Sequence, residues 1–412
     1  MSTTAQQQIG VARPSVNLVW LTVVLGALSA FAPFSVDMYL ASLPKLAASF
    51  HASAGEVQLG LSLFFLGLSL GQLVFGPLID RFGRKPPLLA GIALFATTSL
   101  LIAFAPNIES FVFLRLLQAF GGCAGMIIGR AVISDLFEER EAASVLSLIM
   151  MVQGVGPIVA PVIGGYIIVA AGWPAVFLFL TVLGLACFAG TCWAVPETLP
   201  PERRKRENPG QILRTYASLL CKRGFILPAL CGSFAFGSLF AFISDSPFVY
   251  MELYGVAPQH FGWLFGINAV GIIFSAQLNR LLLRRFTSET ILGGALAVNI
   301  LMGALLLLIL RTSSLPLLVA TLWIIFATLP LIAANTVALA MAEGSEHLGS
   351  ASGLIGVTQF GLAALSSSLI GLLHNGTAYP MAAIIFLCSL LAGLAALMQR
   401  RLSLPGSEVN QL

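Results

Sequence analysis

Long uninterrupted stretches of apolar residues dominate the chain, and short polar or Gly- and Pro-containing breaks separate them. The stretches are continuous and do not alternate with period two, so they predict α-helices and argue against a β-barrel. Most of them are about 20 residues long or more, the length that a helix needs to cross a bilayer. The pattern predicts an all-α membrane protein with twelve spans: 16–40, 56–77, 87–106, 110–134, 143–170, 174–195, 224–250, 261–280, 290–310, 316–341, 350–373 and 378–399.

One long polar segment divides these spans into six and six. It begins at Pro196 and contains the sequence PETLPPERRKRENPG, whose proline and charge content is typical of a linker. We therefore expect an N-terminal six-helix bundle, a cytoplasmic linker and a C-terminal six-helix bundle with a short tail, at residues 1–195, 196–223 and 224–412. Faint similarity between segments 35–40 and 246–251 indicates parallel repeats, an arrangement that places a transport site at the midplane between the halves.

The composition excludes several classes of protein. Hydrophobic residues make up 58% of the 412 positions and charged residues 9%, whereas a soluble domain carries about 25% charged residues. A soluble enzyme, a nucleic-acid-binding protein and a disordered chain are therefore excluded. The six cysteines form no CxxC pair and no cluster with the four histidines, so no metal site is indicated. The GxxxxGK[ST] loop of ATPases is also missing, and we expect no cofactor and an ion gradient as the energy source.

The distribution of positive charge predicts the orientation in the membrane. With the N-terminus inside, seventeen of the 21 Lys and Arg residues fall in inner segments, and only Lys45 and Arg311 fall in outer segments. This bias predicts that both termini face the cytoplasm. A cleaved signal peptide is the alternative for the first span, but that apolar stretch continues to Leu40.

The sharpest motif is GPLIDRFGRKP, residues 76–86, in the loop between the second and third spans. Gly76 and Gly83 permit a tight reversal, and Asp80 can cap a neighbouring helix. Three basic residues add positive charge to the inner side: Arg81, Arg84 and Lys85. From these properties alone, a simple turn with a topology signal and a functional loop are equally consistent.

This loop resembles the G-x-L-x-D-x-x-G-R-K signature of the major facilitator superfamily. The segment from Arg115 to Gln118 resembles the R-x-x-Q motif of that family. The fifth span is similar to the Gly-Pro-x-x-Gly-Gly element of antiporting exporters, through Gly156, Pro157, Pro161, Gly164 and Gly165.

Three further segments, 36–44, 196–204 and 247–250, resemble the bicyclomycin- and chloramphenicol-resistance exporters of the Bcr/CflA type. The chain departs from the family pattern at Ala119 and Ala160, where glycines are usual. Ser29 stands where some multidrug relatives carry a second acid in the first span. That departure argues against a coupling scheme with two carboxylates.

The resemblance implies a twelve-helix major facilitator fold in a bacterial inner membrane. It implies a drug:proton antiporter that exports small amphipathic compounds by alternating access. The expected partners are small-molecule substrates, protons and the lipid bilayer, without nucleic acid, and the expected state is a monomer. A transporter of a sugar, amino acid or small peptide with the same fold is the alternative. A membrane receptor or enzyme has no supporting motif.

Ionisable residues at membrane depth are the candidates for proton coupling, because a charge there is costly. Asp37 is the only acid in the first span, and in an apolar cavity it could load and release a proton. An interfacial position after Pro33 is the alternative. Arg115 in the fourth span is the candidate partner of such an acid, and a structural pairing with backbone carbonyls is its alternative.

A second set of residues predicts a latch on the inner side. Arg130 and Asp135 lie near the inner end of the fourth span, where they could join Arg84 when the cavity opens outward and separate when it opens inward. A surface network of the same residues is the alternative. Asp245 in the seventh span is either a second charge in the cavity or a cap at the outer end.

The fifth span and a set of aromatic and polar residues complete the candidate site. Pro157 and Pro161 each remove a backbone hydrogen bond, so this span is a candidate hinge, with a tightly packed static helix as the alternative. The residues that we expect to bind substrate are Tyr39, Gln118, Asp245, Phe248, Tyr250, Asn268, Gln359 and Phe360. The chain has 29 Phe, so ordinary packing is the alternative for each aromatic residue.

Overall fold

The computed structural model describes residues 18–137, 139–204, 209–345 and 348–403. Within these ranges, twelve spans are helical, long and apolar enough to cross a membrane, which confirms the predicted fold class. The spans are Trp20–Phe50, Ala54–Phe82, Lys85–Ala103, Ile108–Leu136, Met151–Ala171, Trp173–Ala194, Arg223–Leu253, Pro258–Leu282, Ser288–Thr312, Leu315–Glu343, Leu348–Leu373 and Tyr379–Arg401.

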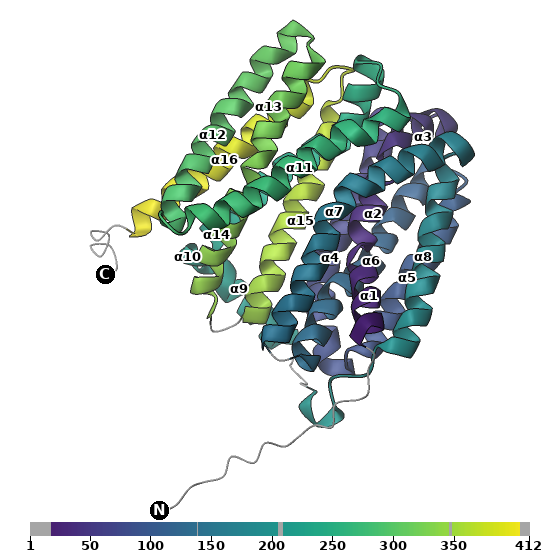
Figure 1. Cartoon of the computed structure of the whole chain (residues 1–412), viewed down its shortest axis with the longest axis vertical. Helices are drawn as coiled ribbons and strands as arrows, with labels where there is room; N and C mark the ends of the chain where they lie inside the picture. Colours follow the sequence, from purple (N-terminus) through teal and green to yellow (C-terminus); the bar gives the residue numbers. More distant parts are fainter. Residues whose placement is uncertain (1–17, 138, 205–208, 346–347, 404–412) are drawn as a thin grey trace, which may run out of the picture.

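The first half of the chain forms one group of helices, coloured purple to teal in Figure 1. Its elements are α1 (Leu18–Ser29), α2 (Phe31–Asp37), η1 (Leu40–Ser42), α3 (Leu43–Phe50), α4 (Ala54–Phe82), α5 (Lys85–Ala103), α6 (Ile108–Leu136), α7 (Glu139–Ala171) and α8 (Trp173–Ala194). Turn chemistry sets several of the boundaries. Ser53 and Glu56 form a capping box at the start of α4, and Gly83 ends α4 with a φ of 93°.

The second half forms the green to yellow group in Figure 1. Its elements are α10 (Arg223–Pro247), η3 (Phe248–Leu253), α11 (Pro258–Leu282), α12 (Ser288–Ile309), η4 (Leu310–Thr312), α13 (Leu315–Ala327), α14 (Leu329–Glu343), α15 (Leu348–Leu373) and α16 (Tyr379–Ser403). The tenth span is interrupted at Thr328, between α13 and α14. Its Oγ1 donates a hydrogen bond to the carbonyl of Ile325 and accepts one from the Asn299 amide, so polar groups at the break have partners.

The first span is also interrupted, although the sequence predicts one continuous stretch at 16–40. Helix α1 ends at Ser29, α2 ends at Asp37, and the chain then continues through η1 into α3. Ser42 donates to the carbonyl of Tyr39, and Ser29 donates to that of Gly26. These hydroxyls bond carbonyls near the two breaks, so the breaks carry a lower cost at membrane depth.

A short helix, α9 (Pro209–Cys221), lies inside the predicted linker. It packs against α10 and α15 of the second half. Directly after it, Lys222 Nζ lies 3.1 Å from a carboxylate oxygen of Glu343 and donates to the carbonyl of the same residue. The segment before α9 contacts the first half instead, since Glu197 accepts from the backbone amides of Arg84 and Lys85.

The two halves meet along two helix pairs, α4 with α15 and α7 with α11. We call the end with Gly83 and α9 the linker end, and the end with Ser53 and His374 the far end. At the far end the backbones come close, because a Cβ on Gly55 would lie 2.5 Å from the carbonyl oxygen of Gly371. Gly262 likewise lies against the backbone of α7 at Val162. Small residues thus close the interface at this end.

Candidate functional site

A cavity of about 1210 Å³ lies between the two halves. Its walls come from both of them, with Asp37 and Phe65 on the first half and Phe240 and Asn268 on the second. It extends to the linker end, where Asp80 and residues of α9 line it. Since the halves are in close contact at the far end, the structure shows a cavity that faces the linker end.

Asp37 lies on the wall of this cavity, at the C-terminal end of α2. Its side chain is only 4% exposed. Within the described ranges it has no hydrogen-bond or ion-pair partner, and a buried carboxylate without a partner is costly to keep charged. The last turn of α2 therefore places a buried acid in the cavity wall.

Aromatic rings form much of the wall. Phe236 and Phe240 lie one helical turn apart on α10, with ring centroids 4.7 Å apart. Phe360 packs edge-on against Phe236, and Phe240 packs against Phe65 across the two halves. Such a surface suits flat apolar ligands, because ring faces and edges pack against one another in several geometries.

Five carboxamides add polar groups to the same wall: Gln72, Gln153, Gln211, Asn268 and Gln359. Asn268 is 3% exposed, and neither of its amide atoms has a hydrogen-bond partner within the described chain. A buried amide in that state costs free energy until a ligand or water satisfies it. Asn268 is therefore placed to hydrogen-bond a ligand.

Arg115 is fully buried beside the cavity and makes no ion pair with a carboxylate of the described residues. Its guanidinium donates to Gln118 Oε1 at 2.6 Å and to the Ser35 carbonyl at 2.9 Å. It also lies over the rings of Tyr39 and Phe64, at 4.3 and 4.2 Å from their centroids. Of these partners, the Ser35 carbonyl is of the kind that the structural alternative names, and this contact connects Arg115 to the segment that carries Asp37.

The candidate substrate residues fall into two groups. Asn268, Gln359 and Phe360 line the cavity. Five others are buried elsewhere and do not line it in this conformation: Tyr39, Gln118, Asp245, Phe248 and Tyr250. Tyr39 and Gln118 surround Arg115, and Asp245 lies at the far end, nearer to the predicted cap than to a charge in the cavity.

The loop residues form a compact network at the linker end. Arg84 pairs with Asp80 at 2.8 Å and with Asp135 at 3.0 Å. Lys85 donates to the carbonyl of Cys192, and Gly83 packs against Glu197. All these groups belong to the first half and its adjoining segment, and the pairs are present while the cavity faces this end. The Arg84–Asp135 pair of the expected latch is thus formed in this state and lies within one half, and the opening of the latch during transport stays a prediction.

The remaining loop and hinge candidates have separate locations. Gly76 and Arg130 line the cavity, whereas Arg81 is exposed and lies beside the ring of Phe82. Helix α7 is continuous through Pro157 and Pro161, with Pro157 on the cavity wall.

The glycines of α7 allow close packing in this conformation. Gly164 lies directly against the backbone carbonyl of Met38, and Gly165 faces that of Pro258. Gly156 contacts the ring of Pro33.

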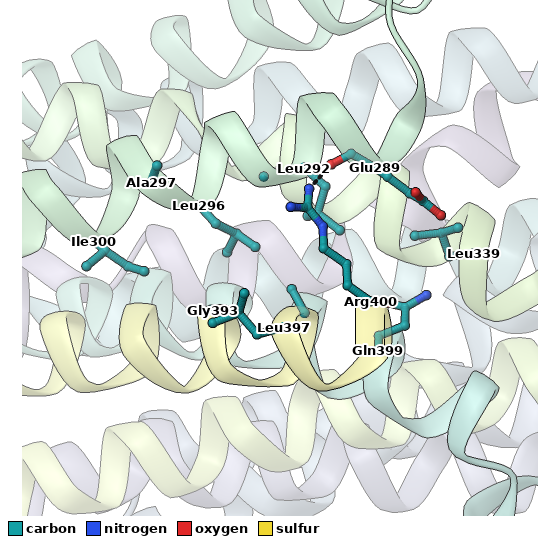
Figure 2. A pocket seen from close by; sticks show the side chains of 12 residues that line it. Glu289, Leu292, Leu296, Ala297, Ile300, Leu339, Gly393, Leu397, Gln399 and Arg400 are labelled. Atoms are coloured by element: carbon teal, nitrogen blue, oxygen red, sulfur yellow. Dashed lines mark hydrogen bonds between the residues drawn. The ribbon is translucent and has the colours of Figure 1, made fainter. Parts of the chain in front are cut away.

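A second, shallower hollow of about 200 Å³ lies between α12, α14 and α16 (Figure 2). Arg400 crosses it and donates to the backbone carbonyl of Glu289 at 2.6 Å. It shares no lining residue with the central cavity, so it is not part of the same route. No group of three or more His, Cys, Asp or Glu that could hold a metal occurs in the described part of the chain.

Sequence reasoning missed most of the cavity wall. Among the missed residues are Phe65, Gln72, Gln153, Phe236, Phe240, Phe242 and Phe265. The four-residue spacing of Phe236 and Phe240 was the available signal, but such spacing is common in a chain with 29 Phe. Their place on the wall depends on how the two halves pack.

The chain belongs to the Major Facilitator Superfamily, whose family model matches residues 25–368. It is 37% identical over 378 residues to an uncharacterized MFS-type transporter of Bacillus subtilis, covering 91% of this chain and 94% of the relative. It is 34% identical to a bicyclomycin resistance protein homolog of Haemophilus influenzae, covering 90% and 94%. It is 28% identical to a chloramphenicol resistance protein of Pseudomonas aeruginosa, covering 89% and 87%.

Solved structures support the same fold. A bacterial homolog of the human lysosomal transporter Spinster, in an inward-facing and occupied conformation, superposes with a TM-score of 0.72 at 15% identity, covering 93% of this chain and 96% of that one. A D-xylose-proton symporter gives 0.68 at 16% identity, covering 92% and 97%. The protein is thus a transporter and not an enzyme, it is a multi-pass protein of a bacterial inner membrane, and its resemblance to the resistance exporters is confirmed.

Proposed function

We propose that this transporter exports small amphipathic drugs in exchange for protons. Names of two relatives, a bicyclomycin resistance protein homolog and a chloramphenicol resistance protein, support the drug class. The observation that carries the proposal is the buried Asp37 carboxylate, without a described partner, on the wall of an aromatic cavity between the halves. A proton and a substrate can then compete for one site.

The proposed cycle follows from this position. With the cavity open to the cytoplasm, Asp37 releases its proton and the aromatic wall takes up substrate. With the cavity open to the outside, Asp37 takes up a proton and substrate leaves. Each proton that returns with the membrane potential supplies about 2.3 kcal/mol per 100 mV, which drives uphill export. The two halves rock about the midplane to expose the cavity to each side in turn.

Everted membrane vesicles with a pH-sensitive dye test this proposal. Respiration acidifies the lumen and quenches the dye, and a transported compound draws protons out and restores fluorescence. We expect chloramphenicol-like compounds to restore it with the wild type and to fail with Asp37→Asn, which cannot exchange a proton. The matched control is Glu109→Gln, an exposed acid at the start of α6. Wild-type recovery of fluorescence with Asp37→Asn would overturn the assignment of Asp37.

Transport of a polar metabolite is the second candidate, and the five carboxamides of the wall favour it. Amide groups hydrogen-bond uncharged hydroxyl and carbonyl groups, which sugars and peptides carry in number. The same vesicles distinguish the two candidates. A response to sugars, amino acids or dipeptides with none to the drugs supports the metabolite, and the reverse supports drug export.

A further inference from the structure

A cluster of polar and titratable side chains closes the far end of the interface between the halves. At its centre, Asp245 at the end of α10 is only 1% exposed. Gln58 of α4 donates its amide to Asp245 Oδ1 at 3.0 Å and to the Ser244 carbonyl at 3.3 Å. The contact therefore joins a side chain of the first half to an acid of the second half.

His374, in the connection between α15 and α16, faces the same oxygen. Its Nδ1 lies 3.6 Å from Asp245 Oδ1, an ion-pair distance, and has no hydrogen-bond partner among the described residues. Its side chain is 21% exposed, whereas that of Asp245 is 1% exposed. The ring thus lies between solvent at the far end and a sealed carboxylate.

The surroundings of His374 favour its protonated form. The polar contact with Asp245 raises the pKa of His374 above its ordinary value, burial opposes the shift, and Glu252 of η3 adds a smaller effect in the same direction as Asp245. The other groups against this pair are neutral, with the Phe248 ring 5.3 Å from the imidazole and the Gln58 amide on the carboxylate.

We propose that His374 and Asp245 form a proton-binding site that keeps the far end closed while His374 carries its proton. When the far end is closed, Asp245 is sealed from water, and within the described part of the chain the protonated imidazole is the one cationic group paired with it, beside the neutral Gln58 amide. When the halves separate at this end, Asp245 loses Gln58 and gains water, so it depends less on the imidazolium. The closed state therefore binds the proton more tightly than the open state, and by linkage the proton favours closure.

The stabilisation of the closed far end falls as the pH rises, because the pKa of His374 is raised. The stabilisation is fully present below the ordinary pKa of histidine, about 6.5. It is lost as the pH rises through the raised pKa of His374. The proton comes from the outer solution and adds to the Nδ1 lone pair, so no other reactant is required. This site is distinct from Asp37 and does not require that drugs are the substrate.

The test measures the separation of the halves at the far end. Spin labels at Glu109→Cys and Arg311→Cys, two exposed positions on different halves, report this distance. The two exposed native cysteines, Cys192 and Cys221, are replaced by serine, and the four buried ones remain. All samples carry Asp37→Asn, so that the pH response of the cavity acid is absent.

We expect the ratio of short to long distances to fall by about threefold or more between about pH 5.5 and about pH 8.5. His374→Gln should remove this pH dependence, and so should Asp245→Asn, which keeps an amide that can still contact Gln58. His260→Gln, an exposed histidine at the start of α11, should keep it. Size-exclusion profiles and melting temperatures confirm that each variant is folded.

A parent that shows no pH dependence would overturn the proposal, and so would unchanged pH dependence in folded His374→Gln. Because the measurement contains no substrate and lacks the Asp37 acid, its failure is separate from failure of drug:proton exchange. Loss of dye recovery in Asp37→Asn vesicles with an intact pH response here would leave both proposals standing. Normal dye recovery in Asp37→Asn vesicles together with an absent pH response at the far end would reject both proposals.

Discussion

Arg115 shows how the protein keeps a full charge buried without an ion pair to a described carboxylate. Its guanidinium donates to two oxygen acceptors, on Gln118 and Ser35, and aromatic rings cover it. A lysine ammonium has a different shape and cannot hold two separated acceptors while it stacks on rings. The Gln118 contact agrees with helix geometry, because residues three apart share a helix face.

Replacing Arg115 with lysine should therefore weaken the first half. We expect Arg115→Lys to lower the free energy of unfolding by about 3 kcal/mol, since buried acceptors lose their donors. Thermal unfolding in detergent measures the effect. Arg311→Lys, an exposed arginine at the far end, is the control. An unchanged melting temperature in Arg115→Lys would show that charge alone is sufficient at this position.

For single residues, the sequence-based predictions agree best with the structure where the residue type is rare in membrane spans. An acid in an apolar span is rare, so Asp37 stood out, and the structure places it on the cavity wall. Tyr39 and Phe248 stood out for their motif, but they are packed away from the cavity. A phenylalanine serves a core and a binding wall equally well, and only the packing of helices decides between them.

Two glycines of α7 lie directly against the broken first span, Gly156 at Pro33 and Gly164 at Met38. Gly164 lies against the carbonyl of Met38, one residue after Asp37. A methyl group at this position would overlap that oxygen. The position of Asp37 therefore depends on Gly164 of a different helix. The hydrophobic pattern of one span does not show which residues of another span it contacts.

Gly164→Ala should displace the segment around Asp37. We expect a loss of about 1–3 kcal/mol of stability, as is typical of overpacking, together with weaker proton exchange. Gly154→Ala on the same helix is the control, because its Cβ would meet only the Ile273 side chain at 3.8 Å. Dye recovery in vesicles and melting temperatures check both variants. Normal exchange by Gly164→Ala would show that the segment can relax without consequence.

The elements themselves were largely predictable, because an apolar run of membrane length has one stable structure. The predicted spans agree with the structure apart from details at the ends. The interruptions at Ala30 and Thr328 were not predictable. They leave the apolar pattern intact, and the break at Thr328 is stabilised by a partner that is distant in the chain, Asn299. Helix α9 escaped prediction because the charged residues around it dominate the composition of its segment.

At the scale of the whole molecule, the structure is closed at the far end and hollow toward the linker end. Ser62 of α4 donates to Ser367 of α15 at 3.0 Å, so side chains from the two halves touch there. Positive charge predicts that the linker end is cytoplasmic, and the cavity would then face inward. The hydrophobic periodicity of the sequence cannot indicate which conformation is present, because the same helices form both the inward-facing and the outward-facing state.

A disulfide across this contact should stop the cycle. We expect Ser62→Cys together with Ser367→Cys to lose dye recovery on oxidation, because the halves can no longer separate at the far end. A reductant should restore it. Each single variant is a control for the loss of the Ser62 hydroxyl contact. Full exchange by the oxidised double variant, with the disulfide confirmed by mass spectrometry, would mean that this interface need not open.

The partners of the linker residues also have a consequence for how the polypeptide can be made. Glu197 and Thr198 bond to Arg84 and Asp135 of the first half, and Arg204 reaches Glu197. From α9 onward the contacts are to α10 and α15. The covalent connection between Arg204 and Pro209 is therefore the natural place for a break in the gene. Two separately translated chains, each with six spans, would retain their own linker contacts and could assemble in the membrane into the same transporter.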